Sequence, residues 1–153
     1  MTPSSADVDL MRGALALAIE AGNAGEVPVG AVVADPSGRV IGRGRNRREE
    51  THDPSAHAEV IAMREAAREL GSWNLDGCTL IVTLEPCLMC AGTLLQARIS
   101  RVVFGAWDEK AGAAGSLYDV VRDRRLPYRA EVVGGILEDE TRAPLERFFR
   151  TRR

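Results

Sequence analysis

Apolar residues follow two alternating patterns along the chain, one with helical spacing and one in continuous runs. Helical spacing predicts helices over residues 7–21, 53–72, 87–98, 116–121 and 143–153. Continuous β-branched runs predict strands over residues 27–35, 39–46, 78–85, 101–106 and 130–136, and a short turn makes the first two a hairpin. Because helices alternate with strands that are apolar on both faces, we predict an α/β layered domain with partly parallel strands. No internal repeat or linker is visible, so we expect residues 1–153 to form one domain.

Composition is that of an ordinary globular protein. Of the 153 residues, 45% are hydrophobic and 27% are charged, which allows a sizeable core. The first nine residues lack the features of a signal peptide, and no run of 18 apolar residues occurs. We therefore expect a cytoplasmic protein without membrane contact. Thiols stay reduced in the cytoplasm, which argues against a structural disulfide.

Charge is unevenly distributed. The formal net charge of −2 argues against a general nucleic-acid binder. However, residues 122–129 carry four arginines against one aspartate, and residues 142–153 carry five arginines against one glutamate. Such local basic surfaces suit one defined polyanionic partner, although solvated helix ends also collect arginine.

Potential metal ligands occur at the starts of two predicted helices. Cys87 and Cys90 are three residues apart, so their sulfur atoms share one helical face. His57 and Glu59 point roughly 200° apart around a helix axis, so they share an ion only beyond the N-terminal tip. One imidazole and two thiolates suit a zinc ion with an open fourth position, where a glutamate could accept a proton from bound water.

Spacing alone leaves other interpretations open. His52 lies five residues before His57, so the two histidines and two cysteines could form a closed structural zinc site. A redox Cys-x-x-Cys pair is a further alternative, but it gives the His-x-Glu segment no role. Cys78 falls in an apolar strand, where a small core residue is expected. Trp73 and Trp107 could stack on bases or simply pack.

The segments "HAE" and "PCLMC" match the H-x-E…P-C-x-x-C signature established for zinc-dependent nucleoside and nucleobase deaminases. Longer stretches, "EVPVGAVV", "GRNRREETHDPSAHAE", "TLEPCLMCAGTLLQARISRVVFGA" and "DEKAGAAGSLYDV", resemble the bacterial tRNA-specific adenosine deaminases along nearly the whole chain. This resemblance implies the three-layer α/β/α cytidine deaminase-like fold, with a central mixed five-stranded sheet and helices on both faces.

The resemblance also implies a reaction. His57, Cys87 and Cys90 would bind one Zn²⁺ per subunit, and Glu59 would be the proton shuttle. Zinc-bound hydroxide would attack C6 of the wobble adenosine in a tRNA anticodon stem-loop and give inosine. The family resemblance further implies a homodimer, and DNA is not an expected partner.

Carried over by residue, the resemblance implies a set of RNA contacts. Asn46 and Val29 would surround the flipped base, and Asp108 and Lys110 would contact flanking nucleotides. The RNA path along the last helix would be lined by Phe149, Arg152 and Arg153. Trp107 and the pair Arg47 and Arg48 depart from the family pattern near the expected RNA entrance.

Two further functions share these residues. A deaminase of a free nucleobase, such as cytosine or guanine, would keep every metal ligand but would not need the basic C-terminal helix. A non-catalytic zinc or RNA-binding module would make Glu59 dispensable.

Overall fold

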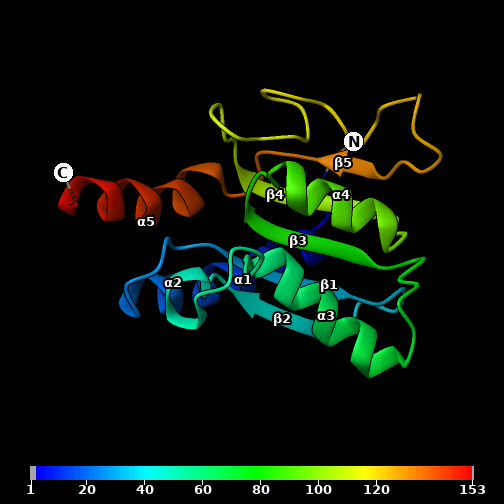
Figure 1. The fold of residues 1–153 in the computed structure, drawn as a ribbon, viewed down its shortest axis with the longest axis horizontal. Helices are drawn as coiled ribbons and strands as arrows, with labels where there is room; N and C mark the ends of the chain where they lie inside the picture. The colour runs from blue at the N-terminus through cyan, green and yellow to red at the C-terminus, as the bar shows by residue number, and fades with distance from the viewer. Residues whose placement is uncertain (1–2, 153) are drawn as a thin grey trace.

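Five strands form one mixed sheet in the computed structural model, which describes residues 3–152 (Figure 1). The strands are β1 (Gly30–Ala34), β2 (Val40–Arg45), β3 (Thr79–Leu84), β4 (Arg101–Ala106) and β5 (Glu131–Val133), in the order β2-β1-β3-β4-β5. β1 is antiparallel to both β2 and β3, whereas β3, β4 and β5 run parallel. The predicted mixed sheet with partly parallel neighbours is therefore confirmed.

Helices cover both faces of this sheet. They are α1 (Ser5–Asn23), α2 (Arg48–Thr51), α3 (Ala58–Leu70), α4 (Leu88–Gln96) and α5 (Glu138–Thr151). Figure 1 shows α3 and α4 in front of the sheet and α1 behind it. α5 packs against α1, β3 and β4, and it extends beyond one end of the sheet. The three-layer arrangement is as predicted. Within residues 3–152, no helix is long and apolar enough to cross a membrane.

The three central strands, β1, β3 and β4, are apolar on both sides because both sides are buried. On the α1 side, Val32, Ile81 and Val103 pack against Met11 and Ala14. The side of α3 and α4 holds the larger cluster, to which the strands contribute Ala31, Val33, Leu80, Val82, Val102 and Phe104. Two cores thus fix the sheet from opposite sides and hold the starts of α3 and α4 at one end.

Two glycines in β2 allow α3 to lie unusually close to the sheet. A Cβ atom at Gly42 would lie 2.2 Å from the carbonyl oxygen of Ala62, and one at Gly44 would lie 2.3 Å from that of Ala58. Any larger residue would push the helix away. Because Ala58 is the first residue of α3, the two glycines also place the start of that helix.

Four details differ from the predicted elements. Residues 116–121 form turns rather than a helix, because Ala114 and Asp119 pair as an isolated bridge. α3 begins at Ala58 instead of near residue 53, since the preceding residues form a turn. α5 begins at Glu138 and continues through Pro144, with three acidic residues in its first turn. The short helix α2 was not predicted.

Candidate metal centre and substrate cavity

His57 occupies the N-cap position of α3 in an extended conformation, with φ −76° and ψ 151°. The turn before it is held by Asp53, whose carboxylate accepts hydrogen bonds from the amide and hydroxyl groups of Ser55, both at 2.8 Å. An Asp-Pro turn of this kind competes with helix formation. His57 is thereby left just outside the helix, and its imidazole lies beyond the tip, as the geometry of the His-x-Glu segment requires.

The two cysteines lie at the start of α4. Cys87 is the N-cap residue of this helix, so Pro86 precedes the cap rather than opening the first turn as the sequence suggested. The Nδ1 atom of His57 lies 3.6 Å from the sulfur of Cys87 and 3.5 Å from that of Cys90. Two helix N-termini therefore converge on one point, which favours thiolate ligands.

Protonation of these side chains is coupled. Hydrogen bonding with Cys90 lowers the pKa of Cys87 to about 4, and the same contact raises the pKa of Cys90. A hydrogen bond with Cys87 raises the pKa of His57. The group thus shares protons in the way expected of ligands that release them when a metal binds.

The donor set fits zinc. One ligand atom each from His57, Cys87 and Cys90 lies within 4.8 Å of the others. Three such donors leave a fourth position for water or substrate, as in catalytic zinc sites. His52 is exposed at the end of α2 and does not belong to this group, which argues against a closed site with four protein ligands. Cys78 is a buried core residue, as expected.

Glu59 lies in the first turn of α3, two residues after His57. Its side chain is only 4% exposed, and burial raises its pKa to about 7. A carboxyl group with a pKa near neutrality can both accept and donate a proton at physiological pH. Glu59 also lines the same small cavity as His57 and Cys87.

This inner cavity, of about 160 Å³, brings together several of the predicted substrate contacts. Val29, Asn46 and Asp108 line it together with the metal-site residues. Two hydrogen bonds fix the amide group of the Asn46 side chain. Its nitrogen donates to the carbonyl oxygen of Val27 at 3.3 Å, and its oxygen accepts from the backbone amide of Arg48 at 3.1 Å. Arg48 also lines the cavity, whereas Arg47 forms an ion pair with Glu50.

A larger outer hollow of about 1060 Å³ adjoins the inner cavity. Asp108 and Ala111 line both, so the two hollows share a wall. Lys110 and the exposed ring of Phe149 line the outer hollow, as does Trp107. The Trp107 ring meets Phe104 edge to face, with 4.8 Å between the ring centres, so its position is fixed by packing.

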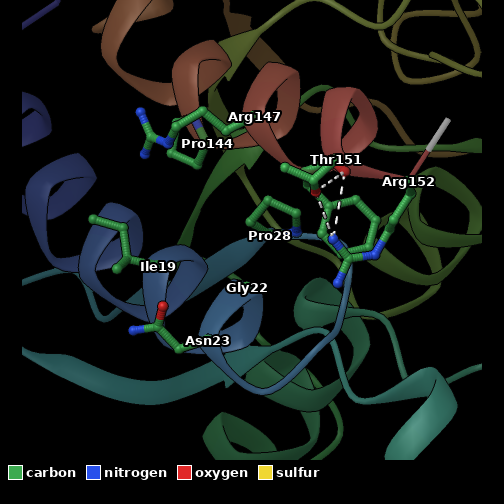
Figure 2. Close-up of a pocket in the computed structure, with 9 residues that line it drawn as sticks. Ile19, Gly22, Asn23, Pro28, Pro144, Arg147, Thr151 and Arg152 are labelled. Carbon is green, nitrogen blue, oxygen red and sulfur yellow. Dashed lines mark hydrogen bonds between the residues drawn. The ribbon is translucent and has the colours of Figure 1, made fainter.

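Arg152 lies elsewhere. It lines a groove between α1 and α5, where Figure 2 shows it beside Thr151 and across from Ile19 and Asn23. Its guanidinium group stacks 3.6 Å from the centre of the Phe148 ring. The structure therefore does not bring Arg152 into the hollow that contains Phe149. Arg153 lies outside the described residues.

Both arginine-rich segments contain paired and unpaired arginines. In residues 122–129, Arg122 pairs with Asp119 and Arg125 with Asp123, at 2.8 Å and 2.7 Å. The arginines of the two segments that are exposed and have no acidic partner among residues 3–152 are Arg124, Arg129, Arg147, Arg150 and Arg152. Three of these five lie at the end of the last helix, which therefore offers a cationic surface.

Two buried carboxylates near the cavity were not identified from the sequence. The Glu26 carboxylate accepts hydrogen bonds from the backbone amides of Glu49 and Glu50, at 3.1 Å and 2.7 Å, and thereby holds the start of α2. Glu85 accepts four hydrogen bonds from residues 108–116. Both partners are distant in sequence, so no local pattern could reveal these contacts.

Comparison with known proteins agrees with this geometry. Residues 4–106 match the family described as the cytidine and deoxycytidylate deaminase zinc-binding region. The chain is 46% identical to a tRNA-specific adenosine deaminase of Bacillus subtilis (strain 168), over 92% of this chain and 86% of the relative. A structure from studies of A-to-I editing by tRNA:A34 deaminases is 42% identical with a TM-score of 0.86, over 90% of this chain and 99% of that one. A guanine deaminase from Nitrosomonas europaea is 26% identical with a TM-score of 0.78, over 97% and 86% of the chains.

Proposed function

The chain belongs to the cytidine and deoxycytidylate deaminase family, and we propose that it converts adenosine to inosine at the wobble position of a tRNA anticodon. The observation that carries this proposal is its extensive similarity to tRNA adenosine deaminases, in both sequence and fold. The reaction consumes water and releases ammonia. The enzyme is accordingly a zinc-dependent hydrolytic deaminase.

His57, Cys87 and Cys90 would hold the zinc ion, and their geometry and donor types support that role. When bound, zinc lowers the pKa of a coordinated water from 15.7 to about 7 and so supplies a nucleophile at neutral pH. We assign the proton transfers to Glu59. Its carboxylate accepts a proton from the attacking water, delivers it to N1 of the adenine and later assists the departure of ammonia from C6. The intermediate pKa of Glu59 suits both directions of transfer.

The substrate contacts follow the two adjoining hollows. Val29 and Asn46 would contact the flipped adenine in the inner cavity, and Asp108 would meet the neighbouring nucleotide at the boundary between the hollows. Lys110 and Phe149 would contact RNA in the outer hollow. Arg152 and Arg153 would then contact phosphates farther along α5, a role supported by the unpaired arginines of that helix in residues 3–152.

The enzyme is further proposed to be a homodimer made of one domain per chain, active in the cytoplasm, where tRNA and reduced thiols occur together. Exposed apolar side chains support a self-association surface at the start of α4 and the adjacent turn: Leu88, Met89, Leu117 and Tyr118. The bridge between Cys87 and Gly112 holds these two segments together. Sedimentation equilibrium should give twice the 16.5 kDa chain mass. A purely monomeric species would contradict the dimer.

The decisive experiment measures inosine formation in an anticodon stem-loop RNA with adenosine at the wobble position. Free cytosine, guanine and adenosine are incubated with the same enzyme in parallel. Inosine formed only in the hairpin would support the proposal. Turnover of a free base alone would instead indicate a nucleobase deaminase with the same zinc chemistry. A zinc-loaded protein inactive on all four substrates would indicate a non-catalytic zinc module.

A further inference from the structure

Glu85 is a buried carboxylate that lines the inner cavity and to which the proposed reaction assigns no proton transfer. It follows β3 directly and is only 2% exposed. No arginine, lysine or histidine among residues 3–152 lies within ion-pair distance of it. A buried negative charge is costly unless hydrogen bonds compensate for it. The neighbours of Glu85 must therefore supply that compensation.

The Glu85 carboxylate accepts four hydrogen bonds, and all four come from one segment, residues 108–116. The amide of Asp108 and the hydroxyl of Ser116 donate to Oε1, at 3.0 Å and 2.6 Å. The amides of Ala114 and Ser116 donate to Oε2, both at 3.0 Å. Hydrogen bonds to an ionised acceptor are stronger than neutral ones. Glu85 is thus the centre around which this irregular segment folds.

The segment also wraps closely around the carboxylate. A Cβ atom at Gly112 would lie 2.3 Å from the carboxyl carbon of Glu85, so only glycine fits at this position. The amide of Gly112 donates to the carbonyl oxygen of Asp108 at 2.8 Å, and the amide of Ala113 donates to that of Pro86 at 2.8 Å. The segment therefore has little freedom to move while the carboxylate is in place.

Asp108 is the charged residue of this segment that lines the inner cavity, where Ala111 is its neighbour. Asp108 lines both the inner cavity and the outer hollow. Its backbone is held on both sides, because its amide donates to Glu85 and its carbonyl oxygen accepts a hydrogen bond from the amide of Gly112 at 2.8 Å. The side-chain carboxylate of Asp108 accepts hydrogen bonds from the backbone amides of Lys110 and Ala111, at 3.1 Å and 3.2 Å. The orientation of this cavity wall thus depends on Glu85.

We propose that Glu85 is a positioning residue that determines which nucleotide is accepted beside the wobble adenosine, by fixing Asp108 at the cavity entrance. This inference rests on the proposed function. It assigns Glu85 to the recognition of the RNA rather than to the chemical step, because its carboxylate is fully engaged by the four donors.

The variant Glu85→Gln tests the idea selectively. If the amide oxygen replaces Oε2, it still accepts the amides of Ala114 and Ser116. The NH₂ group then replaces Oε1 and faces the Ser116 hydroxyl, which can rotate, and the amide of Asp108, which cannot accept a hydrogen bond. The substitution therefore conserves shape but releases the backbone of Asp108 in particular.

The experiment compares kcat/KM for a set of hairpins that share the wobble adenosine and differ in one flanking nucleotide. In Glu85→Gln, we expect the ratio between the best and the other hairpins to fall by about tenfold, the change that corresponds to roughly 1.4 kcal/mol. The zinc content of the variant should stay near wild type. Asp7→Asn is the matched control, because it loses a buried carboxylate far from the cavity and should keep the wild-type ratio.

Ser116→Ala provides a second variant, which removes the hydroxyl contacts to Glu85 and Asp108 but keeps the carboxylate. It should shift the ratio in the same direction and by less. An unchanged ratio in both variants would overturn the inference, as would an equal loss on all hairpins or a loss of zinc in Glu85→Gln. If wild-type enzyme forms no inosine in any hairpin, the proposed function itself fails. Wild-type activity with unaltered discrimination in the variants refutes only the role of Glu85.

Discussion

Replacing Glu59 with glutamine separates metal binding from proton transfer. The amide has nearly the shape of the carboxyl group, and the ligands His57, Cys87 and Cys90 are untouched. Glutamine cannot accept a proton from water or deliver one to the base. The zinc content should consequently stay at the wild-type level while turnover is lost.

The size of the loss follows from the other carboxylates at the inner cavity. One carboxylate oxygen of Asp108 already accepts hydrogen bonds from two backbone amides. The Glu85 carboxylate already accepts four hydrogen bonds from residues 108–116. The Glu85 carboxylate is therefore not available to replace Glu59. General acid–base catalysis contributes about 10²–10⁴ in rate. Because Glu59 serves several transfers, we expect a fall in kcat near 10⁴-fold, which corresponds to about 5.5 kcal/mol.

Single-turnover inosine formation at saturating enzyme measures this loss, and elemental analysis measures zinc in the same preparations. The unfolding temperature of Glu59→Gln should not fall, because the substitution removes a carboxyl group whose charged form is disfavoured by burial. His57→Ala is the control, since it should lose both zinc and activity. A Glu59→Gln enzyme within tenfold of wild type would refute the assigned proton shuttle.

Three further predictions address the RNA surface, the fold and the metal. Arg152→Ala combined with Arg153→Ala should weaken hairpin binding and reduce the slope of log K against log salt by about 1.4, and an unchanged slope would place the RNA path elsewhere. Asp7→Asn breaks a bidentate ion pair with Arg101, with both contacts at 2.6 Å, so urea unfolding at pH 7 should show a loss of about 3 kcal/mol. Hydrogen bonds from Arg101 lower the pKa of Asp7, so the stabilisation by this ion pair is fully present above the ordinary pKa of 3.8. The difference in unfolding free energy between variant and wild type should therefore shrink as the pH falls below 3.8. A difference that persists in acid would contradict the ion pair. Removal of the metal by a chelator should abolish inosine formation, added Zn²⁺ should restore it, and full activity of zinc-free protein would refute the zinc mechanism.

Sequence reasoning succeeded where the information is local or periodic. The apolar runs identified the central strands, because strands covered on both faces contain few polar positions, and the turn after β1 identified β2 as its hairpin partner. The spacing of Cys87 and Cys90, and the need for an ion beyond the tip of the helix at His57, predicted that these three side chains lie together, and the structure brings them within 4.8 Å of one another. These features depend on residues within a few positions of one another.

Prediction from the sequence failed where a side chain that is distant in the sequence determines the local backbone conformation. Residues 116–121 have helical spacing, yet the carboxylate of Glu85 binds the amides of Ala114 and Ser116 and holds the chain in turns. The start of α2 is likewise fixed by Glu26, more than 20 residues earlier. A carboxylate that binds backbone amides leaves no signature in the sequence of the segment that it organises.

The same buried carboxylates reconcile an acidic composition with an RNA substrate. Glu26 and Glu85 are both only 2% exposed, and neither has an ionic partner within residues 3–152. They contribute two of the negative charges in the formal net charge of −2, so the charges of the other groups sum to zero. Backbone amides rather than arginines stabilise Glu26 and Glu85, which leaves Arg147, Arg150 and Arg152 of α5 available to phosphate groups. The net charge of the chain therefore understates the positive charge that a polyanion meets at the surface.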